Sequence, residues 1–298
     1  MDFSIVIPTL GRAHSLSRLL RRLSELDYSP GGFEVLVVDD GNPEPLDELV
    51  AGSGGSLPLR LLRQENRGPA AARNLAARQA GGRYLAFTDD DCLPDSNWLK
   101  EIEEAARGSP DAVCGGKTVN DDPANLPAQA TQLLMDFLCA NYNPVSTAGA
   151  FYPANNMAVP REEFLRMGGF DEELRFGEDR EFCHRWRSRG GRFVYAQQAV
   201  VRHTHNLSLR AFVRLHFLYG EGTGRFRQAC RAKKLERPGF SSPRWYWKLI
   251  RSGLDQERGW RGIALSGLLA VSQASAASGV LWASLATSRK REGNHGIR

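Results

Sequence analysis

The 298-residue sequence has few cysteines, and none of them forms a C-x-x-C motif. Its cysteines are odd in number and scattered: Cys92, Cys114, Cys139, Cys183 and Cys230. This pattern argues against a disulfide scaffold and against a zinc site built from thiolates. It fits a protein that folds in a reducing compartment.

Three other signals are missing from the chain. No G-x-G-x-x-G follows the first predicted strand, where the sequence reads "PTLGRAHS", so a Rossmann dehydrogenase is disfavoured. No glycine-rich, lysine-containing phosphate loop is present either. The N-terminus has an acidic residue at position 2 and only a short apolar run, so we do not expect a secretory signal there.

Charge is distributed unevenly along the chain. Residues 201–298 hold 18 Lys and Arg against 5 Asp and Glu, a balance of +13, whereas residues 1–200 have a balance of −8. A basic segment attracts phosphate in nucleic acid, in anionic lipid or in a substrate. The plainer alternative is a solvated basic surface.

Strand-like and helix-like segments alternate, which predicts an α/β fold with a mostly parallel central sheet and helices on both faces. The predicted strands are residues 3–9, 33–40, 57–63, 83–88 and 111–116. The predicted helices are residues 15–28, 68–80, 96–108 (capped by Ser96) and 178–190.

Two predicted strands end in acidic residues, at Asp39–Asp40 and at Asp89–Asp91. Ligands of open α/β sheets bind at the carboxyl ends of the strands, so both acidic ends can line one crevice. In an extended segment Asp89 and Asp91 point the same way and can share a divalent cation, while Asp90 faces elsewhere. The alternative is a turn in which the aspartates only cap the following helix.

A set of segments in one order resembles a known enzyme family: "SIVIPTLGR", "VLVVDDGN", "GPAAARNLA", "FTDDDCLP" and "ANNMAVPREEFLRMGGFDEELRFGEDREFCHRWRSRG". These resemble family 2 of the inverting glycosyltransferases, which have the GT-A fold. The resemblance covers residues 3–205. It implies a catalytic domain at 1–205, with a nucleotide-binding half at 1–120 and an acceptor half at 121–205.

The resemblance also implies the chemistry, namely transfer of a sugar from a nucleotide-diphospho-sugar to an acceptor hydroxyl with inversion. UDP-sugar is the expected donor and Mn2+ or Mg2+ the expected cofactor. The donor-binding residues implied are Pro8, Thr9, Asp39, Asp40, Arg73, Asp89 and Asp90. The metal ligands implied are Asp91, Asp89 and His203, since His203 and His205 alternate along a segment expected to be extended.

Asp179 of "GED" is the expected general base, at the start of a predicted helix whose dipole favours an ionised carboxylate. The acceptor-side residues implied are Asn155, Asn156, Gly169, Phe170, Asp171 and Glu178. Trp186, in the same predicted helix as Asp179, is expected to pack in the core.

Residues 206–298 form a basic, aromatic extension beyond the resemblance. "LRAFVRLHFLYGEGTGRFR" spaces Phe212, Leu215 and Tyr219 as in an amphipathic helix. Gly262–Ser288 contains no charged residue. Three interpretations stay open: helices at a membrane surface, helices buried against the catalytic domain, or a spanning helix. Nucleic acid is not expected as a partner, because no stacking platform is present.

The sequence therefore predicts a metal-dependent inverting glycosyltransferase of cell-envelope polysaccharide or glycolipid synthesis. Its acceptor is expected to be a carbohydrate or glycolipid, and its location the cytoplasm or the cytoplasmic face of the membrane. Two alternatives stay open. One is a nucleotidyltransferase acting on sugar phosphates, and the other is a non-catalytic sugar-nucleotide-binding or membrane scaffold protein.

Overall fold

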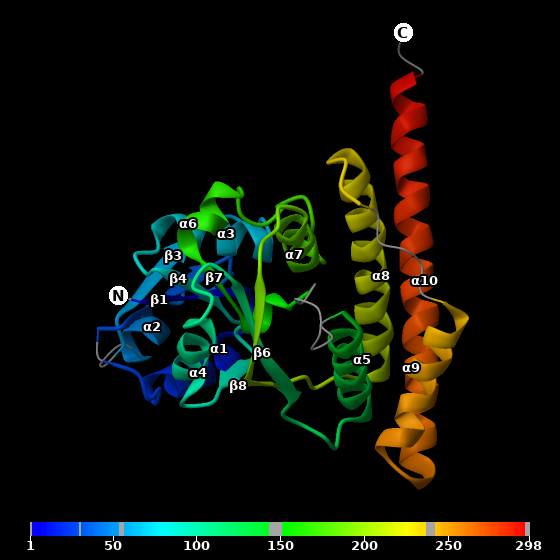
Figure 1. The fold of residues 1–298 in the computed structure, drawn as a ribbon, viewed down its shortest axis with the longest axis horizontal. Helices are drawn as coiled ribbons and strands as arrows, with labels where there is room; N and C mark the ends of the chain where they lie inside the picture. The colour runs from blue at the N-terminus through cyan, green and yellow to red at the C-terminus, as the bar shows by residue number, and fades with distance from the viewer. Residues whose placement is uncertain (1, 30, 54–56, 143–150, 237–241, 296–298) are drawn as a thin grey trace. The chain divides into compact units, whose positions relative to one another are not determined.

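A computed structural model describes residues 2–29, 31–53, 57–142, 151–236 and 242–295 (Figure 1). The chain divides into two compact units. Unit 1 comprises residues 1–121, 142–173 and 178–204, and unit 2 comprises residues 122–141, 174–177 and 205–298. Two internal segments therefore group with the C-terminal extension, and the predicted domain boundary after residue 205 stays a prediction.

Unit 1 is built on one mixed sheet, whose eight strands in the described residues have the order β3-β2-β1-β4-β7-β6-β8-β5. Neighbours among β1 to β4 run parallel, and β7 runs antiparallel to both β4 and β6. The strands are β1 (Phe3–Thr9), β2 (Phe33–Asp39), β3 (Leu59–Arg63), β4 (Tyr84–Phe87), β5 (Cys92–Pro94), β6 (Val113–Asn120), β7 (Met157–Pro160) and β8 (Phe193–His203). The central strands read as continuous apolar runs because both of their faces are buried.

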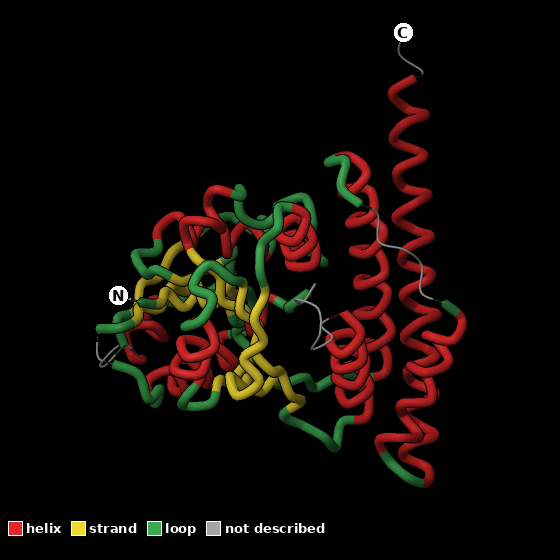
Figure 2. The backbone as a smooth tube through the Cα atoms, in the orientation of Figure 1, coloured by secondary structure: helices red, strands yellow, loops and turns green. Residues whose placement is uncertain are grey.

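Helices cover both faces of this sheet (Figure 2). One core cluster joins the sheet to α1 (Ala13–Ser24), α2 (Asp47–Ser53) and α4 (Trp98–Ala106). The other joins it to α3 (Pro69–Gln79), α6 (Arg161–Arg166) and α7 (Glu178–Ser188). Trp186 of α7 is 4% exposed in the second cluster, which confirms its predicted place in the core. The predicted fold class is confirmed.

Several local predictions need correction. Helix α4 begins at Trp98, and its N-cap is Asn97 rather than Ser96, because Ser96 lies in a turn one residue earlier. The strand β5 and the helix α5 (Leu126–Tyr142) were not predicted. Strand β8 ends at His203, so the alternation expected to place His205 beside it does not extend that far.

Unit 2 is helical and contains α5, α8 (Leu209–Ala232), α9 (Pro243–Gln256) and α10 (Gly259–His295). Helix α8 confirms the predicted amphipathic helix, but Leu215 is only partly buried. The buried stripe instead passes through glycines. A side chain at Gly220 of α8 would collide with the α10 backbone at Ala276, and one at Gly279 of α10 would collide with α8 at Phe217. The glycines thus let the two helices pack backbone to backbone.

Candidate functional site

The ends of three neighbouring parallel strands define the candidate site in unit 1. β1, β2 and β4 end at Thr9, Asp39 and Phe87, and their pairing brings these ends to the same edge of the sheet. The loops that follow carry the two acidic motifs. The predicted convergence of both motifs at one edge follows from this parallel register.

The three aspartates after β4 do not form an extended segment. Asp90 and Asp91 lie in a turn, and the Cys92 amide donates to the Asp89 carbonyl over 3.0 Å. The prediction that Asp89 and Asp91 point the same way along an extended segment is therefore wrong. Instead, Asp89 faces Arg73, whereas Asp90 and Asp91 share Arg12 as a partner.

Two arginines and a hydroxyl offset the repulsion within this triplet. Arg73 donates to Asp89 over 2.6 Å, and the Thr9 hydroxyl donates to Asp90 over 2.7 Å. Arg12 pairs with both Asp90, at 2.9 Å, and Asp91. Burial raises the pKa of the fully buried Asp90 to about 7, against the opposing effects of Arg12 and Thr9.

Arg73 is the buried connection between this triplet and helix α7. Its side chain is 5% exposed, and it donates to Glu178 over 2.6 Å as well as to Asp89. Burial lowers the pKa of Arg73, but the two carboxylates outweigh it and raise the pKa overall. The predicted role of Glu178 in holding the acceptor needs correction, since this buried carboxylate is turned to Arg73.

Asp179, next to Glu178, is half-buried at the start of α7. Its carboxylate accepts hydrogen bonds from the backbone amides of Ala154, at 3.1 Å, and Arg180, at 2.7 Å. Burial raises the pKa of Asp179 and of Glu178, and repulsion between the two neighbours adds to the shift for Glu178. The site thus holds a positioned carboxylate whose pKa lies above that of an ordinary aspartate.

Hydrogen bonds, mostly from neighbouring loop residues, hold the predicted nucleotide-binding residues Asp39, Asp40 and Thr9. Asp39 accepts from the Asn42 backbone and side-chain amides, at 2.8 and 2.7 Å. Asp40 accepts from Gln64 and from the backbone amides of residues 67 and 68 at the start of α3. Pro8 and Thr9 are buried in β1, and the Thr9 hydroxyl is bound to Asp90. The Thr9 hydroxyl therefore faces Asp90, and its contact with a donor stays a prediction.

The predicted acceptor residues fall into two groups. Asn156 is fully buried, and its amide bonds to Trp98, at 2.9 Å, and to the carbonyls of Lys117 and Ala199. Phe170 is 2% exposed and packs in the core with Phe87. These two residues cannot line an acceptor wall, and their predicted contact is wrong.

Of the remaining acceptor-side residues, Asn155 and Asp171 lie nearer the surface, whereas Gly169 is buried. Asn155 and Asp171 are partly exposed, with Thr118 donating to Asn155 over 3.2 Å. Gly169 has a φ of +70°, and a side chain there would collide with Asn74. Their contact with an acceptor stays a prediction.

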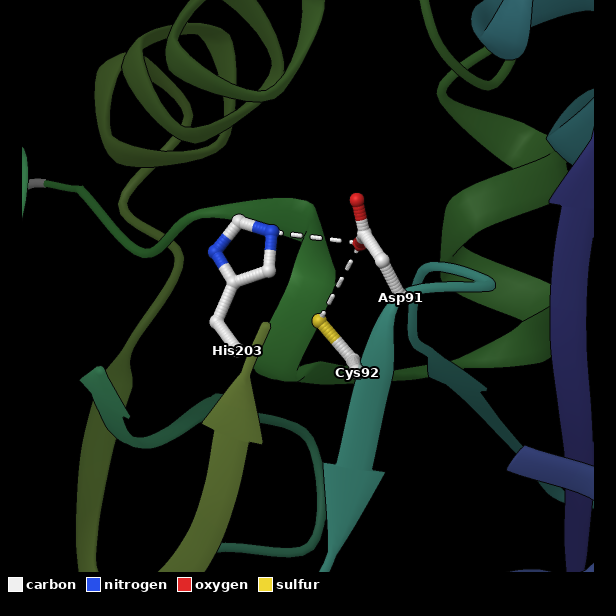
Figure 3. A group of neighbouring side chains, drawn as sticks. All are labelled: Asp91, Cys92 and His203. Atoms are coloured by element: carbon white, nitrogen blue, oxygen red, sulfur yellow. Dashed lines mark hydrogen bonds and ion pairs between the residues drawn. The ribbon is translucent and has the colours of Figure 1, made fainter. Parts of the chain in front are cut away.

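Asp91 and His203 form a group that could hold a metal ion (Figure 3). The His203 Nε2 atom lies 3.1 Å from Asp91 Oδ1, and the Cys92 sulfur lies 3.9 Å from the same oxygen. Carboxylate and imidazole suit Mn2+, whereas a thiol does not suit a hard cation. Burial raises the pKa of Cys92 well above its usual value, so its thiol stays protonated. Asp89, which faces Arg73, is not part of this group.

Comparison with protein families decides where the chain belongs. Residues 4–164 match the family model "Glycosyl transferase family 2". The chain belongs to glycosyl transferase family 2. The matched region contains all three aspartates and Arg73, while Asp179 and His203 lie beyond it.

Several curated proteins resemble this family 2 chain. The pre-mycofactocin glycosyltransferase of Mycobacterium tuberculosis is 30% identical over 228 residues, which cover 74% of this chain and 46% of the relative. The validoxylamine A glucosyltransferase of Streptomyces hygroscopicus subsp. limoneus is 27% identical, over 72% of this chain and 56% of the relative. The chain thus spans about half the length of these relatives.

Solved structures show that the family 2 chain has the GT-A fold. The mannosyltransferase PcManGT from Pyrobaculum calidifontis, in complex with GDP-Man and Mn2+, superposes with a TM-score of 0.64 at 19% identity. The alignment covers 94% of this chain and 87% of that structure. S. aureus TarS 1-349 in complex with UDP-GlcNAc gives a TM-score of 0.55 at 20% identity, covering 94% of this chain and 89% of that structure.

The sequence interpretation missed two residues of this site. Arg12 pairs with two members of the aspartate triplet, and its only sequence signal is a cation three residues after the end of β1. Asn74 is buried in α3 and exchanges two hydrogen bonds with the Phe170 backbone, at 2.8 and 2.9 Å. A polar residue amid the alanines of α3 was the available signal for Asn74.

Proposed function

We propose that this protein transfers a sugar from a nucleotide-diphospho-sugar, most simply a UDP-sugar, to an acceptor hydroxyl with inversion. The observation that carries the proposal is the double contact of Arg73. This buried arginine joins Asp89, in the acidic turn after β4, to Glu178, the neighbour of Asp179. The elements for donor binding and for proton removal thus meet through one rigid connection.

Asp179 is the proposed general base. Inversion in a single displacement requires a carboxylate that takes the proton of the acceptor hydroxyl while the bond to the anomeric carbon forms. Its two backbone hydrogen bonds fix the carboxylate and leave about two of its four acceptor positions available for a hydroxyl. Its raised pKa makes it a stronger base than an exposed aspartate.

Asp91 and His203 are the proposed ligands of a divalent cation, and their oxygen and nitrogen donors fit Mn2+. When bound, such an ion supplies positive charge that stabilises a departing diphosphate. The protein contributes two ligands from different elements, one after β4 and one at the end of β8. Arg12, which lies against Asp91, supplies further positive charge at this place.

The comparisons support the substrate classes of this proposal. Among the structural neighbours, one is described with GDP-Man and Mn2+ and another with UDP-GlcNAc. We propose a carbohydrate or glycolipid acceptor and a role in envelope polysaccharide or glycolipid synthesis. The location we propose is the cytoplasm or the cytoplasmic face of the membrane.

A screen of nucleotide sugars tests this function. The correct donor should raise the melting temperature by a few degrees at saturating concentration with Mn2+, and chelation should abolish most of the shift. Asp179→Asn should keep this shift and lose transfer by a factor of about 10² to 10⁴ or more. The exposed Glu173→Gln serves as a matched control.

Three results would contradict the proposal in different ways. Stabilisation by donors without any transfer, over a broad acceptor panel, would favour the non-catalytic binding protein. Release of pyrophosphate from a nucleoside triphosphate and a sugar phosphate would favour a nucleotidyltransferase. Unchanged transfer by Asp179→Asn would remove this residue from the mechanism.

A further inference from the structure

Helix α10 has a long outer face without charge. Its large apolar side chains Trp260, Ile263, Leu281, Trp282 and Leu285 are 56% to 68% exposed. The exposed positions between them, from 267 to 278, are small or apolar. Single exposed apolar residues are ordinary, but a continuous uncharged face is typical of a surface that binds something.

Helix α9 extends this apolar surface. Trp247 and Leu254 of α9 are 60% and 51% exposed. They border a cavity of about 310 Å³ lined by Trp247, Ile250, Arg251, Leu254, Asp255 and Ser266, where α9 packs against α10. We call the exposed apolar residues of the two helices, Trp247, Leu254, Trp260, Ile263, Leu281, Trp282 and Leu285, the outer surface of unit 2.

Positive charge accompanies this outer surface. Unit 2 as a whole holds 18 Lys and Arg against 7 Asp and Glu, a balance of +11. Exposed cations of α9 and of the segment leading to α10 include Arg244, Lys248, Arg251 and Arg258. The Arg251 guanidinium lies 5.1 Å from the centre of the Trp247 ring, so cation and aromatic ring occupy one place.

We propose that the outer surface of unit 2 binds an anionic phospholipid bilayer, with α9 and α10 lying in the plane of the interface. The apolar side chains enter the boundary between headgroups and acyl chains, and the cations lie against lipid phosphates. This inference uses only unit 2 and does not depend on the transfer chemistry of Asp179.

The packing of α8 favours an orientation in the plane over a crossing. By length and composition, Gly259–Ala286 could span a membrane. Its most apolar 18-residue stretch has a mean hydropathy of 1.4, and 22% of that stretch is buried. However, α8 packs along α10 with backbone contacts at Gly220 and Gly279. α8 carries Arg210, Arg214, Glu221, Arg225, Arg227 and Arg231. A crossing would draw these charges into hydrocarbon or break the helix pair.

Charge favours lipid over a second copy of the chain. In a dimer through α10, two units of balance +11 would face each other, and their repulsion would oppose association. If the two α10 helices pack in parallel, Arg258 of one copy lies close to Arg258 of the other. An antiparallel pairing sets Arg258 toward the basic end of the partner's helix, which carries Arg289, Lys290 and Arg291. An anionic bilayer is complementary to the same charges.

Flotation of the full chain with lipid vesicles tests the proposal. We expect binding to vesicles of phosphatidylcholine with about one-third phosphatidylglycerol, little binding to phosphatidylcholine alone, and weaker binding at high salt. Trp260→Ser with Ile263→Ser should lower the partition coefficient at least about tenfold. Lys248→Gln with Arg258→Gln should lower it about fivefold per charge at low salt.

Controls separate lipid binding from misfolding and from dimerisation. Leu209→Ser is matched, because Leu209 of α8 is 59% exposed in the same unit but lies outside the outer surface. It should bind vesicles like the unchanged protein. Equal binding by the Trp260 and Ile263 double variant would overturn the proposal, as would a dimer that this variant dissociates. Resistance to alkaline carbonate extraction from cell membranes would overturn the in-plane orientation.

Discussion

Arg73 donates a 2.6 Å hydrogen bond to Glu178, which lies 105 residues further along the chain. Both side chains are at most 8% exposed, so neither charge is shared with bulk water. The second arm of Arg73 reaches Asp89 at the same distance. One guanidinium therefore positions helix α7 against the acidic turn, and four predictions test this arrangement and its surroundings.

Removal of Arg73 should be costly to both stability and transfer. Arg73→Ala leaves Glu178 buried without its partner, and we expect a loss of about 3 to 5 kcal/mol in the free energy of unfolding. Arg73→Lys should not restore transfer, because a compact ammonium lacks the two separate N–H arms that reach Asp89 and Glu178. Urea unfolding measures the first effect, and the rate of sugar transfer measures the second.

Arg78→Ala on the same helix is the control for Arg73, since Arg78 is exposed. Its free energy of unfolding should lie within about 0.5 kcal/mol of that of the unchanged protein. A stable Arg73→Ala variant with normal transfer would show that the connection is incidental.

The rate of transfer should depend on pH through Asp179. Burial raises the pKa of this carboxyl, and only its ionised form can accept a proton. As the pH falls through the raised pKa, kcat/KM should drop about tenfold per unit, starting above the ordinary aspartate value of about 3.9. Glu173→Gln should leave the profile unchanged, whereas a profile flat down to pH about 4 would exclude a raised pKa in the base.

The affinity for Mn2+ should distinguish the proposed metal ligands, Asp91 and His203, from the neighbouring Cys92. Asp91→Ala and His203→Ala should each weaken Mn2+ binding at least about 10-fold, because loss of even an indirect partner of a metal ligand typically costs that much. Cys92→Ala should leave the affinity unchanged, since a protonated thiol is a poor ligand for a hard cation. Titration of free Mn2+ by electron paramagnetic resonance measures this without turnover.

The opposite order of effects on Mn2+ affinity would contradict the proposed metal ligands. If Cys92→Ala weakens binding while His203→Ala does not, the ligand set proposed here is wrong. Asp89→Asn is a further contrast, because Asp89 faces Arg73 and should affect Mn2+ binding less than Asp91→Ala does.

Asn156 should prove structural. Its buried amide makes three hydrogen bonds, so Asn156→Ala should cost about 2 to 4 kcal/mol of unfolding free energy. The neighbouring, partly exposed Asn155→Ala should cost less than about 1 kcal/mol. A stable Asn156→Ala variant whose only defect is a raised acceptor KM would restore the original prediction for this residue.

Much of the architecture was readable from local sequence. The apolar runs at 3–9 and 33–39 became strands within one residue of prediction, because strands buried on both faces tolerate only such runs. The order of the motifs also identified the family. Elements without a local sequence signal were not predicted. The three-residue β5 is one of them, because only its pairing with β8 defines it as a strand.

The sequence by itself determined which carboxylate and cationic side chains the site contains and at which edge of the sheet they lie. Only the tertiary structure decided which group faces which. A turn rather than a strand after β4 sent Asp89 to Arg73, Asp90 to Thr9 and Asp91 to His203. These partners lie 16 to 112 residues apart, and no local propensity encodes such contacts. Turn geometry and the packing of α3 and α7 on the sheet fix them together.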